Sequence, residues 1–336
     1  MRGAFQMKPS IYYACRLPVA AGGELVNFQH VAILRRKGWR AFALLDDGSK
    51  VAVPSRPYAV PMVQLGDAMV FQPDDVLVLP EITPPSAWEK FAALPCRKVM
   101  HNQNPYYTFQ SFASMQALNA YGLAGGLCCS RFTAQMLGRL GTQLNWQVVR
   151  PFVLPVFAQG ADKPKKRQVA FMPRKRPVDG MLLRQIFANL HPHLADVPWV
   201  EISNMARPQV AQVLGESQVF ASLSHYEGLG LPPLEAMAAG SLVCGFDGQG
   251  GQEYATPDNG FWVADGDLEG FAHAVAKALE LPAEEAQMRV LMGQATVSHY
   301  TESRFEQELE LAWRTVLGDQ CSDFMLPHPA GEAHAN

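Results

Sequence analysis

The sequence predicts an α/β protein with two halves, each a doubly wound parallel sheet flanked by helices, that face each other across a cleft. Short apolar runs alternate with amphipathic helical stretches, which is typical of a parallel sheet covered by helices. The alternation stops near residues 150–166 and then restarts. A length of 336 residues also corresponds to about two domains of roughly 150 residues each.

In the first half, an amphipathic helix is the clearest element. Apolar residues from Leu25 to Leu34 follow helical spacing, and Gly38 is placed to end the helix. A glycine-containing loop at residues 20–24 precedes it. Residues 150–166 hold prolines and a Lys-Pro-Lys-Lys run, which indicates a linker. Strands are predicted at residues 11–14, 41–44, 76–79, 98–100, 126–129 and 147–149.

The second half repeats the alternation and ends in helices. Strands are predicted at residues 169–172, 199–202, 219–223 and 242–244, and helices at 181–190, 209–214, 233–239, 268–279, 283–294 and 302–317. Little periodicity remains after Asp319, so a loose tail is expected. The predicted division is an N-terminal domain at 1–155, a C-terminal domain at 156–304, a terminal helix at 305–318 and a tail at 319–336.

Composition and charge exclude several classes of protein. The 28 basic and 31 acidic residues give a net charge of −3, which argues against a protein that coats nucleic acid. No apolar run reaches the ~18–20 residues of a membrane span, and the first eight residues lack a secretory signal. The six cysteines are scattered without a C-x-x-C pattern, so neither a zinc site nor a disulfide framework is expected. We therefore expect a cytoplasmic protein.

Two carboxylates in residues 224–240 form the strongest candidate site. Glu227 follows the carboxyl end of a predicted strand, where ligands bind in open α/β sheets. Gly228 and Gly230 let a ligand approach the backbone, and Glu235 is expected in the first turn of the next helix. Carboxylates accept hydrogen bonds from sugar and ribose hydroxyls, and a helix N-terminus favours a diphosphate. The alternative is a solvated Glu227 and a Glu235 that complements the helix dipole.

Two further polar groups follow predicted strands. The first strand of the second half is followed by three cations, Arg174, Lys175 and Arg176. They are candidates for binding a diphosphate, and the alternative is a basic loop exposed to solvent. In the first half, His101 begins a polar run after the strand at 98–100. It is a candidate for the cleft lining or a structural histidine. Asn102 and Gln103 beside it are candidates for binding the hydroxyls of an acceptor.

The Glu-x7-Glu element from Glu227 to Glu235 resembles the signature of retaining GT-B enzymes of glycosyltransferase family 4. Gly-Leu-Gly-Leu-Pro lies inside it and Ala-Met-Ala-Ala-Gly follows it. The resemblance implies two Rossmann-like domains, the first on the acceptor side and the second binding a nucleotide-sugar, with the terminal helix at 305–318 crossing back onto the first domain. It implies that Glu227 contacts the donor sugar and that Glu235 binds the ribose. The glycine loop between them would bind the donor through Gly228, Leu229, Gly230 and Leu231.

The same resemblance extends to the other candidates. The family places Gly-Arg and a later lysine against the leaving diphosphate. Arg174 matches the arginine, and either Lys175 or Arg176 takes the place of the lysine. Gly22 and Gly23 resemble the glycine loop that approaches the donor phosphates and the acceptor. His101 corresponds to a histidine near the donor sugar.

Three loop positions have structural interpretations. Ser130 resembles a strand-end serine of the family and is expected to cap the next helix. Residues 247–253 resemble a Gly-Gly-x-x-Glu stretch of the family, in which Glu253 can be structural. Asp267 directly precedes a predicted helix, so it is an N-cap rather than part of a metal-binding D-x-D.

The expected function is transfer of a sugar from a nucleotide-sugar to a hydroxyl of a saccharide or lipid-linked acceptor, with retention of configuration. We expect a role in cell-surface polysaccharide or lipopolysaccharide synthesis, and no cofactor, metal or nucleic-acid partner. Basic segments at 35–37 and 163–167 suggest peripheral contact with the inner face of the membrane. The alternatives are a GT-B epimerase or phosphorylase, and a non-catalytic protein that binds nucleotide-sugars.

Overall fold

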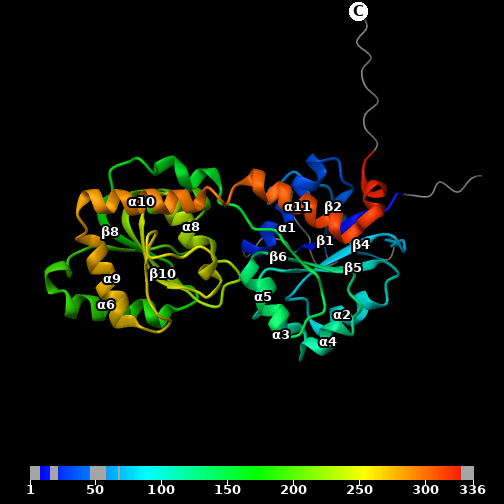
Figure 1. The fold of residues 1–336 in the computed structure, drawn as a ribbon, viewed down its shortest axis with the longest axis horizontal. Coiled ribbons are helices and arrows are strands. Elements are labelled where there is room, and N and C mark those ends of the chain that lie inside the picture. Colours follow the sequence, from blue (N-terminus) through cyan, green and yellow to red (C-terminus); the bar gives the residue numbers. More distant parts are fainter. Residues whose placement is uncertain (1–7, 16–21, 46–57, 67–68, 327–336) are drawn as a thin grey trace, which may run out of the picture. The chain divides into compact units, whose positions relative to one another are not determined.

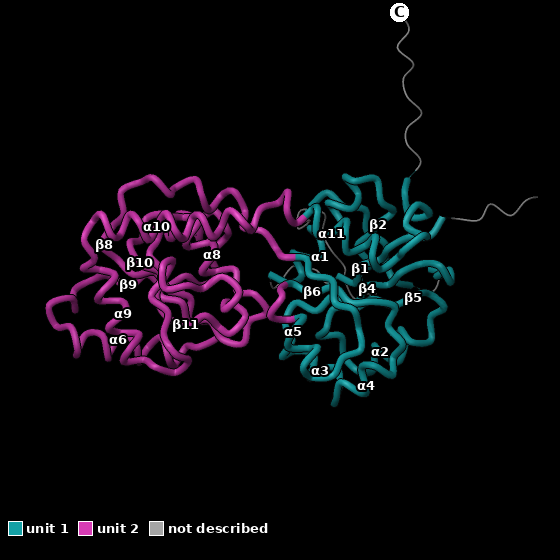
Figure 2. Tube along the Cα trace, in the orientation of Figure 1, with its two compact units in different colours: residues 1–129, 134–149, 306–336 teal, residues 130–133, 150–305 magenta. Residues whose placement is uncertain are grey.

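The computed structural model describes residues 8–15, 22–45, 58–66 and 69–326, which form two compact units (Figure 1). Unit 1 comprises residues 1–129, 134–149 and 306–336, and unit 2 comprises residues 130–133 and 150–305 (Figure 2). Each unit contains its own sheet, and all the strand pairs within the two sheets are parallel.

Unit 1 has a seven-stranded sheet in the order β3-β2-β1-β4-β5-β6-β7, which is a doubly wound order. The strands are β1 (Ile11–Cys15), β2 (Ala41–Leu45), β3 (Met62–Gln64), β4 (Val76–Pro80), β5 (Arg97–Asn102), β6 (Gly125–Cys128) and β7 (Trp146–Val148). The helices are α1 (Gly22–Arg36), α2 (Pro85–Ala92), α3 (Thr108–Ser111), α4 (Met115–Asn119), α5 (Arg131–Arg139), which begins in unit 2, and α11 (Glu302–Leu317), which joins unit 1 from Glu306. All six strands predicted for this half are present.

The predicted helix after β1 is confirmed as α1, but it begins earlier than the sequence suggested. Gly22 and Gly23 form its first turn instead of a loop. Gly38 follows the helix with φ +84°, a conformation that side chains other than glycine's rarely allow. The glycine loop predicted at residues 20–24 is therefore wrong for residues 22–24, and residues 20 and 21 lie outside the described part of the chain.

Unit 2 has a five-stranded sheet in the order β12-β11-β10-β8-β9. Its strands are β8 (Lys166–Phe171), β9 (Trp199–Glu201), β10 (Ser217–Ser224), β11 (Leu242–Asp247) and β12 (Phe261–Trp262). The α-helices that lie wholly within it are α6 (Pro177–Leu190), α7 (Arg207–Glu216), α8 (Leu231–Ala238), α9 (Leu268–Leu279) and α10 (Ala283–Val297), with 3-10 turns at η2 (Pro155–Gly160), η3 (Pro192–Leu194) and η4 (Gly250–Glu253). The parallel two-sheet architecture predicted from the sequence is confirmed.

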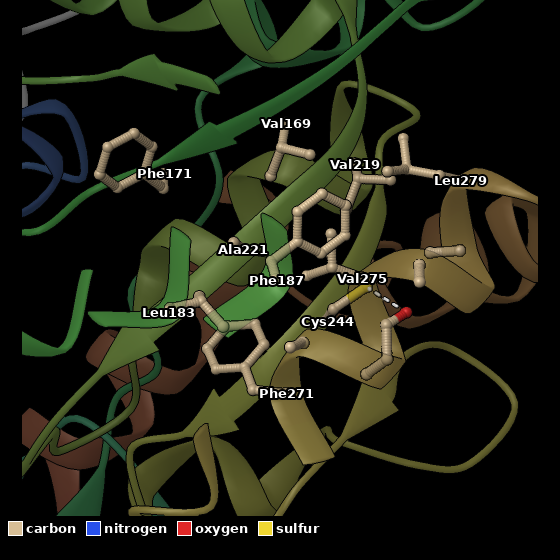
Figure 3. Close-up of a cluster of buried hydrophobic side chains, with 14 of the residues drawn as sticks. Val169, Phe171, Leu183, Phe187, Val219, Ala221, Cys244, Phe271, Val275 and Leu279 are labelled. Carbon is tan, nitrogen blue, oxygen red and sulfur yellow. Dashed lines mark hydrogen bonds between the residues drawn. The ribbon is translucent and has the colours of Figure 1, made fainter. Parts of the chain in front are cut away.

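A cluster of buried side chains joins the sheet of unit 2 to α6 and α9 (Figure 3). Phe187 of α6 and Phe271 of α9 are among its largest members, and Val219 and Cys244 contribute from β10 and β11. The Phe271 ring lies directly over Gly245, where an added Cβ would be 2.1 Å from the ring. Close packing of α9 on the sheet thus requires glycine at this position.

Two segments predicted to be irregular are ordered. Residues 155–160 form η2, in which Phe157 is buried, so this part of the expected linker packs within unit 2. The predicted loose tail is wrong for residues 319–326, because Gly318–Phe324 forms the 3-10 helix η5. Phe324 is fully buried and its carbonyl accepts a hydrogen bond from the Arg40 N–H at 2.7 Å. Residues 327–336 lie outside the described part.

Candidate functional site

The candidate site of unit 2 begins where its central strand ends. β10 pairs with both β8 and β11 and ends at Ser224, so Glu227 lies past its carboxyl end, as predicted. The Glu227 N–H donates to the carbonyl of Gly248 at 2.9 Å. Gly230 adopts φ +86° directly before α8. A left-handed glycine therefore turns the chain from the loop into the helix.

A second glycine loop supports the first through main-chain packing. An added Cβ on Gly250 would lie 2.5 Å from the Glu227 carbonyl oxygen and 2.7 Å from that of Gly228. The Tyr254 hydroxyl donates to the carbonyl of Gly230 at 2.7 Å. Gly250 therefore brings main chain against the loop that carries Glu227.

Lys175 is the cation that pairs with Glu227 in this loop. Its Nζ lies 2.7 Å from Oε1 of Glu227, and the two side chains are 18% and 21% exposed. The same Nζ donates to the carbonyl of His225 at 3.0 Å. A charged pair at the carboxyl end of the sheet therefore joins the loop after β8 to the loop after β10.

The neighbouring arginines are placed differently. Arg176 pairs with Asp179 at 2.8 Å and with Asp265, and its guanidinium carbon lies 4.7 Å from the centre of the Phe246 ring. Its side chain is thereby engaged in holding α6 and the loop before α9. Arg174 is exposed to solvent. Of the three predicted cations, the structure thus brings Lys175 to Glu227.

Glu235 lies in α8 with its carboxyl group buried. It is the fifth residue of the helix, so the prediction that it lies in the first turn is wrong; α8 begins two residues earlier than expected. Burial raises the pKa of Glu235 to about 7, and Arg207 opposes that shift. Nη1 of Arg207 at the start of α7 lies 3.7 Å from Oε1 of Glu235. The Glu235 carboxyl group therefore titrates near neutral pH.

Two predicted helix caps are confirmed. The hydroxyl of Ser130 accepts a hydrogen bond from the N–H of Thr133 at 3.0 Å, and it also donates to the carbonyl of Gly228. The Asp267 carboxylate accepts from the N–H of Gly270 at 2.8 Å. Ser130 thus caps α5 and also fixes the loop that contains Gly228.

Glu253 has a structural position. Its carboxylate accepts from the N–H of Arg131 at 2.6 Å and from that of Phe132 at 3.3 Å, at the N-terminus of α5. The other oxygen pairs with Nε of Arg150 at 2.6 Å, and both side chains are 10% exposed. Glu253 therefore ties together two segments that are far apart in the sequence.

The remaining predicted residues lie in unit 1. His101 belongs to β5, which extends two residues past the predicted strand, and it is fully buried. Its Nδ1 is 2.7 Å from Oδ1 of Asn27, an oxygen that only accepts, so Nδ1 carries the proton. Burial lowers the pKa of His101 to about 3, which keeps the ring neutral. Its Nε2 then carries the lone pair, and no hydrogen-bond donor among the described residues reaches it.

The two candidates for acceptor binding differ in exposure. Asn102 is fully buried and donates to the Thr108 hydroxyl at 2.6 Å. Gln103 is half-buried and donates from Nε2 to the carbonyl of Gly23 at 2.9 Å, so the structure brings these two predicted residues together.

Sequence analysis missed Glu81, Arg207 and Tyr254. Glu81 directly follows β4 and is buried, which raises its pKa to about 7, while the N–H of Gln103 opposes the rise. A carboxylate after a strand was the signal that identified Glu227, and it would have found Glu81. Arg207 and Tyr254 act on the site through tertiary contacts, for which the sequence holds no local signal.

Comparison with known proteins gives concordant results. Residues 201–294 match the family model described as Glycosyl transferases group 1. An alpha-1,6-glucosyltransferase from Actinobacillus pleuropneumoniae is 28% identical over 320 residues, which cover 92% of this chain and 95% of that protein.

The fold is shared with several solved structures. A glycosyltransferase from Rickettsia africae superposes with a TM-score of 0.68 at 14% identity, covering 93% of this chain and 99% of that one. HepE from Anabaena, in complex with UDP-glucose, gives a TM-score of 0.67 at 13% identity, covering 91% and 99%. These likenesses confirm the predicted fold class. No helix in the described part of the chain has the length and apolar character needed to cross a membrane.

Proposed function

Because the chain is a glycosyltransferase with the GT-B fold, we propose that it transfers a glucosyl group from UDP-glucose to a saccharide hydroxyl with retention of configuration, as a member of glycosyltransferase family 4. The observation that carries this proposal is the Lys175–Glu227 pair on the glycine loop before α8. The α-1,6-glucosyltransferase relative supports glucose as the transferred sugar, and the UDP-glucose complex of HepE supports the nucleotide.

The proposed reaction breaks the bond between the anomeric carbon and the diphosphate. The diphosphate keeps the electron pair, and positive charge develops on the sugar. The acceptor oxygen attacks from the same face, and its proton passes to the departing phosphate. No side chain forms a covalent intermediate in this scheme.

Each charge that develops has a group to oppose it. Lys175 and Arg174, with the backbone N–H groups of residues 228–231, neutralise the diphosphate. Glu227 orients the sugar and balances its positive charge, while Glu235 binds the ribose hydroxyls. Because side chains supply the cations, we propose that the reaction needs no metal; the rate in EDTA should then equal the rate in Mg²⁺.

The test measures UDP release from UDP-glucose with and without a saccharide acceptor. The wild-type protein should release UDP in proportion to acceptor glucosylated, and Glu227→Gln should lower kcat by about 10²–10³-fold, as expected for loss of a charged group at the reacting centre. Glucosylation of the same acceptor by an inverting route, detected by NMR of the product, would refute retention. Epimerised UDP-sugar formed without acceptor would instead identify an epimerase.

A non-catalytic binding protein is the competing proposal, since Lys175 or Arg176 has to take the place of the family's later lysine. The contact of Lys175 with Glu227 argues against a binding protein, because it brings a cation to the glycine loop in place of the family's lysine. Tight UDP-glucose binding with neither turnover nor hydrolysis would favour the binding protein.

We propose that the protein acts on the cytoplasmic side, in polysaccharide or lipopolysaccharide synthesis. Peripheral membrane contact through the basic segments is less favoured, because Arg36 and Lys37 pair with Glu306, and Lys166 pairs with Glu216. Sedimentation with anionic phosphatidylglycerol vesicles tests this: recovery of the protein in the supernatant at 0.15 M salt is expected, and co-sedimentation would support a lipid-linked acceptor.

A further inference from the structure

Tyr226 combines two unfavourable features directly beside Glu227. Its backbone has φ +46°, in the left-handed region, and its aromatic side chain is 45% exposed. A bulky residue in this conformation is an outlier that surrounding contacts must maintain. Such outliers concentrate at ligand sites, where the position of the side chain matters more than the cost of the backbone.

The surrounding contacts fix the backbone of this residue. Nζ of Lys175 lies 3.0 Å from the carbonyl oxygen of His225 and 3.4 Å from that of Tyr226, in addition to its contact with the Glu227 carboxylate. On the other side, the Glu227 N–H bonds to Gly248. One ammonium group thus holds three consecutive residues of the loop.

The ring of Tyr226 is also held in place. It stacks on the imidazole of His225, with 3.8 Å between the ring centres and 33° between the planes. Nη2 of Arg176 lies 2.5 Å from Nδ1 of His225 and, since guanidinium only donates, Nδ1 is the acceptor. Partial burial and the charge of Arg176 lower the pKa of His225, in agreement with a neutral ring. A fixed imidazole therefore supports one face of the tyrosine.

We propose that the Tyr226 ring is the platform on which the acceptor pyranose stacks. An aromatic ring is a large, rigid apolar surface with a polar hydroxyl at one end, which suits the C–H face of a sugar and its hydroxyls. Glu227 is proposed to bind the donor sugar, and the exposed ring of the residue before it offers an apolar surface to a second sugar. The proposal rests on the proposed function and adds to it a residue that selects the acceptor.

A purely structural Tyr226 makes different predictions from a sugar platform. If the ring only fills space in the loop, Tyr226→Gly relieves the backbone, raises the melting temperature and leaves acceptor binding intact. If the ring binds a pyranose, Tyr226→Gly and Tyr226→Ala weaken acceptor binding, whereas Tyr226→Phe retains most of it because the aromatic face remains.

The experiment uses the full chain and measures binding of isomaltose in the presence of saturating UDP, with UDP affinity measured separately by calorimetry. Tyr226→Ala should raise the Kd for isomaltose about tenfold, and Tyr226→Phe by less than about threefold, as expected for loss of an aromatic contact. UDP affinity should stay within about twofold in both. Phe109→Ala, which removes another aromatic side chain that is 45% exposed, is the matched control.

Three results would overturn the proposal: an unchanged isomaltose Kd in Tyr226→Ala, weakened UDP binding with unchanged isomaltose binding, or no isomaltose binding by the UDP-bound wild type. Failure of the proposed function is distinguishable, because it would appear in the wild-type protein as UDP-glucose binding without turnover or as no binding of UDP and UDP-glucose. A variant that fails to fold is identified by its melting temperature, and Tyr226→Phe then supplies the comparison.

Discussion

Replacing Glu235 with glutamine should change how stability depends on pH. Glu235 is 9% exposed, and burial raises its pKa to about 7 in the folded protein. Glutamine has the same shape and does not titrate. The folded protein therefore retains a proton that the unfolded chain releases between about pH 4.5 and pH 7, and the free energy of unfolding of the wild type falls as pH rises through that window.

The size of the effect follows from the two pKa values. A difference from 4.5 to about 7 corresponds to about 3 kcal/mol above pH 7, of which about 2.5 kcal/mol develops between pH 5 and pH 8. Arg207 limits this cost. The attraction between two isolated charges about 4 Å apart ranges from about 1 kcal/mol in water to about 4 kcal/mol near a protein surface. Because the Arg207 side chain is 40% exposed, its attraction to Glu235 lies toward the lower end of that range.

The assay is urea unfolding of wild type and Glu235→Gln at pH 5, 6, 7 and 8, followed by tryptophan fluorescence. The free energy of unfolding of Glu235→Gln minus that of wild type should be about 2.5 kcal/mol larger at pH 8 than at pH 5. Arg207→Met should enlarge the pH-dependent loss in the otherwise wild-type protein. Glu269→Gln, which removes an exposed carboxylate on α9, is the control. An equal difference between Glu235→Gln and wild type at pH 5 and pH 8 would refute the reasoning.

Three further changes test other contacts. Lys175→Met should lower kcat/KM for UDP-glucose by about 10²-fold, because it removes a cation from the diphosphate site, and steady-state kinetics measure this; an unchanged value would remove Lys175 from the mechanism. Gly245→Ala should destabilise the protein by at least about 2 kcal/mol in urea unfolding, because its methyl group overlaps the Phe271 ring, and near-wild-type stability would contradict that packing. Ser130→Ala should cost about 1 kcal/mol in the same assay through loss of the α5 cap to Thr133, whereas Ser130→Thr, which keeps the hydroxyl as both acceptor and donor, should recover much of it.

Strong hydrophobic patterns in the sequence were sufficient to predict most of the fold. Buried parallel strands such as β4 and β10 are continuous apolar runs, and α9 was predicted with its observed bounds, Leu268–Leu279. β12 was missed because it has two residues, too few for a pattern, whereas β3 was missed although it is as long as β7 and β9, which were predicted. The order of residues 319–326 was missed because it depends on burial of one aromatic residue, Phe324, at a distant site.

The site could be predicted only where its residues follow strands. Glu227 was placed correctly because the carboxyl end of β10 is evident in the sequence. The sequence left open which of Lys175 and Arg176 takes the place of the family's lysine. In the structure Lys175 pairs with Glu227, whereas Arg176 is engaged by Asp265, Phe246 and His225. Local sequence patterns do not encode pairs of this kind, which form between loops after different strands.

The discontinuity of unit 1 has a consequence for biosynthesis. Its core includes Trp313, whose Nε1–H donates to the Tyr13 hydroxyl at 3.0 Å, and Phe324 of η5, whose carbonyl accepts from the Arg40 N–H. During translation these C-terminal residues leave the ribosome after residues 150–305, so unit 2 can be completed while unit 1 still lacks a helix. A nascent chain stopped before residue 306 should therefore contain a protease-resistant second unit and a first unit that remains a substrate for chaperones.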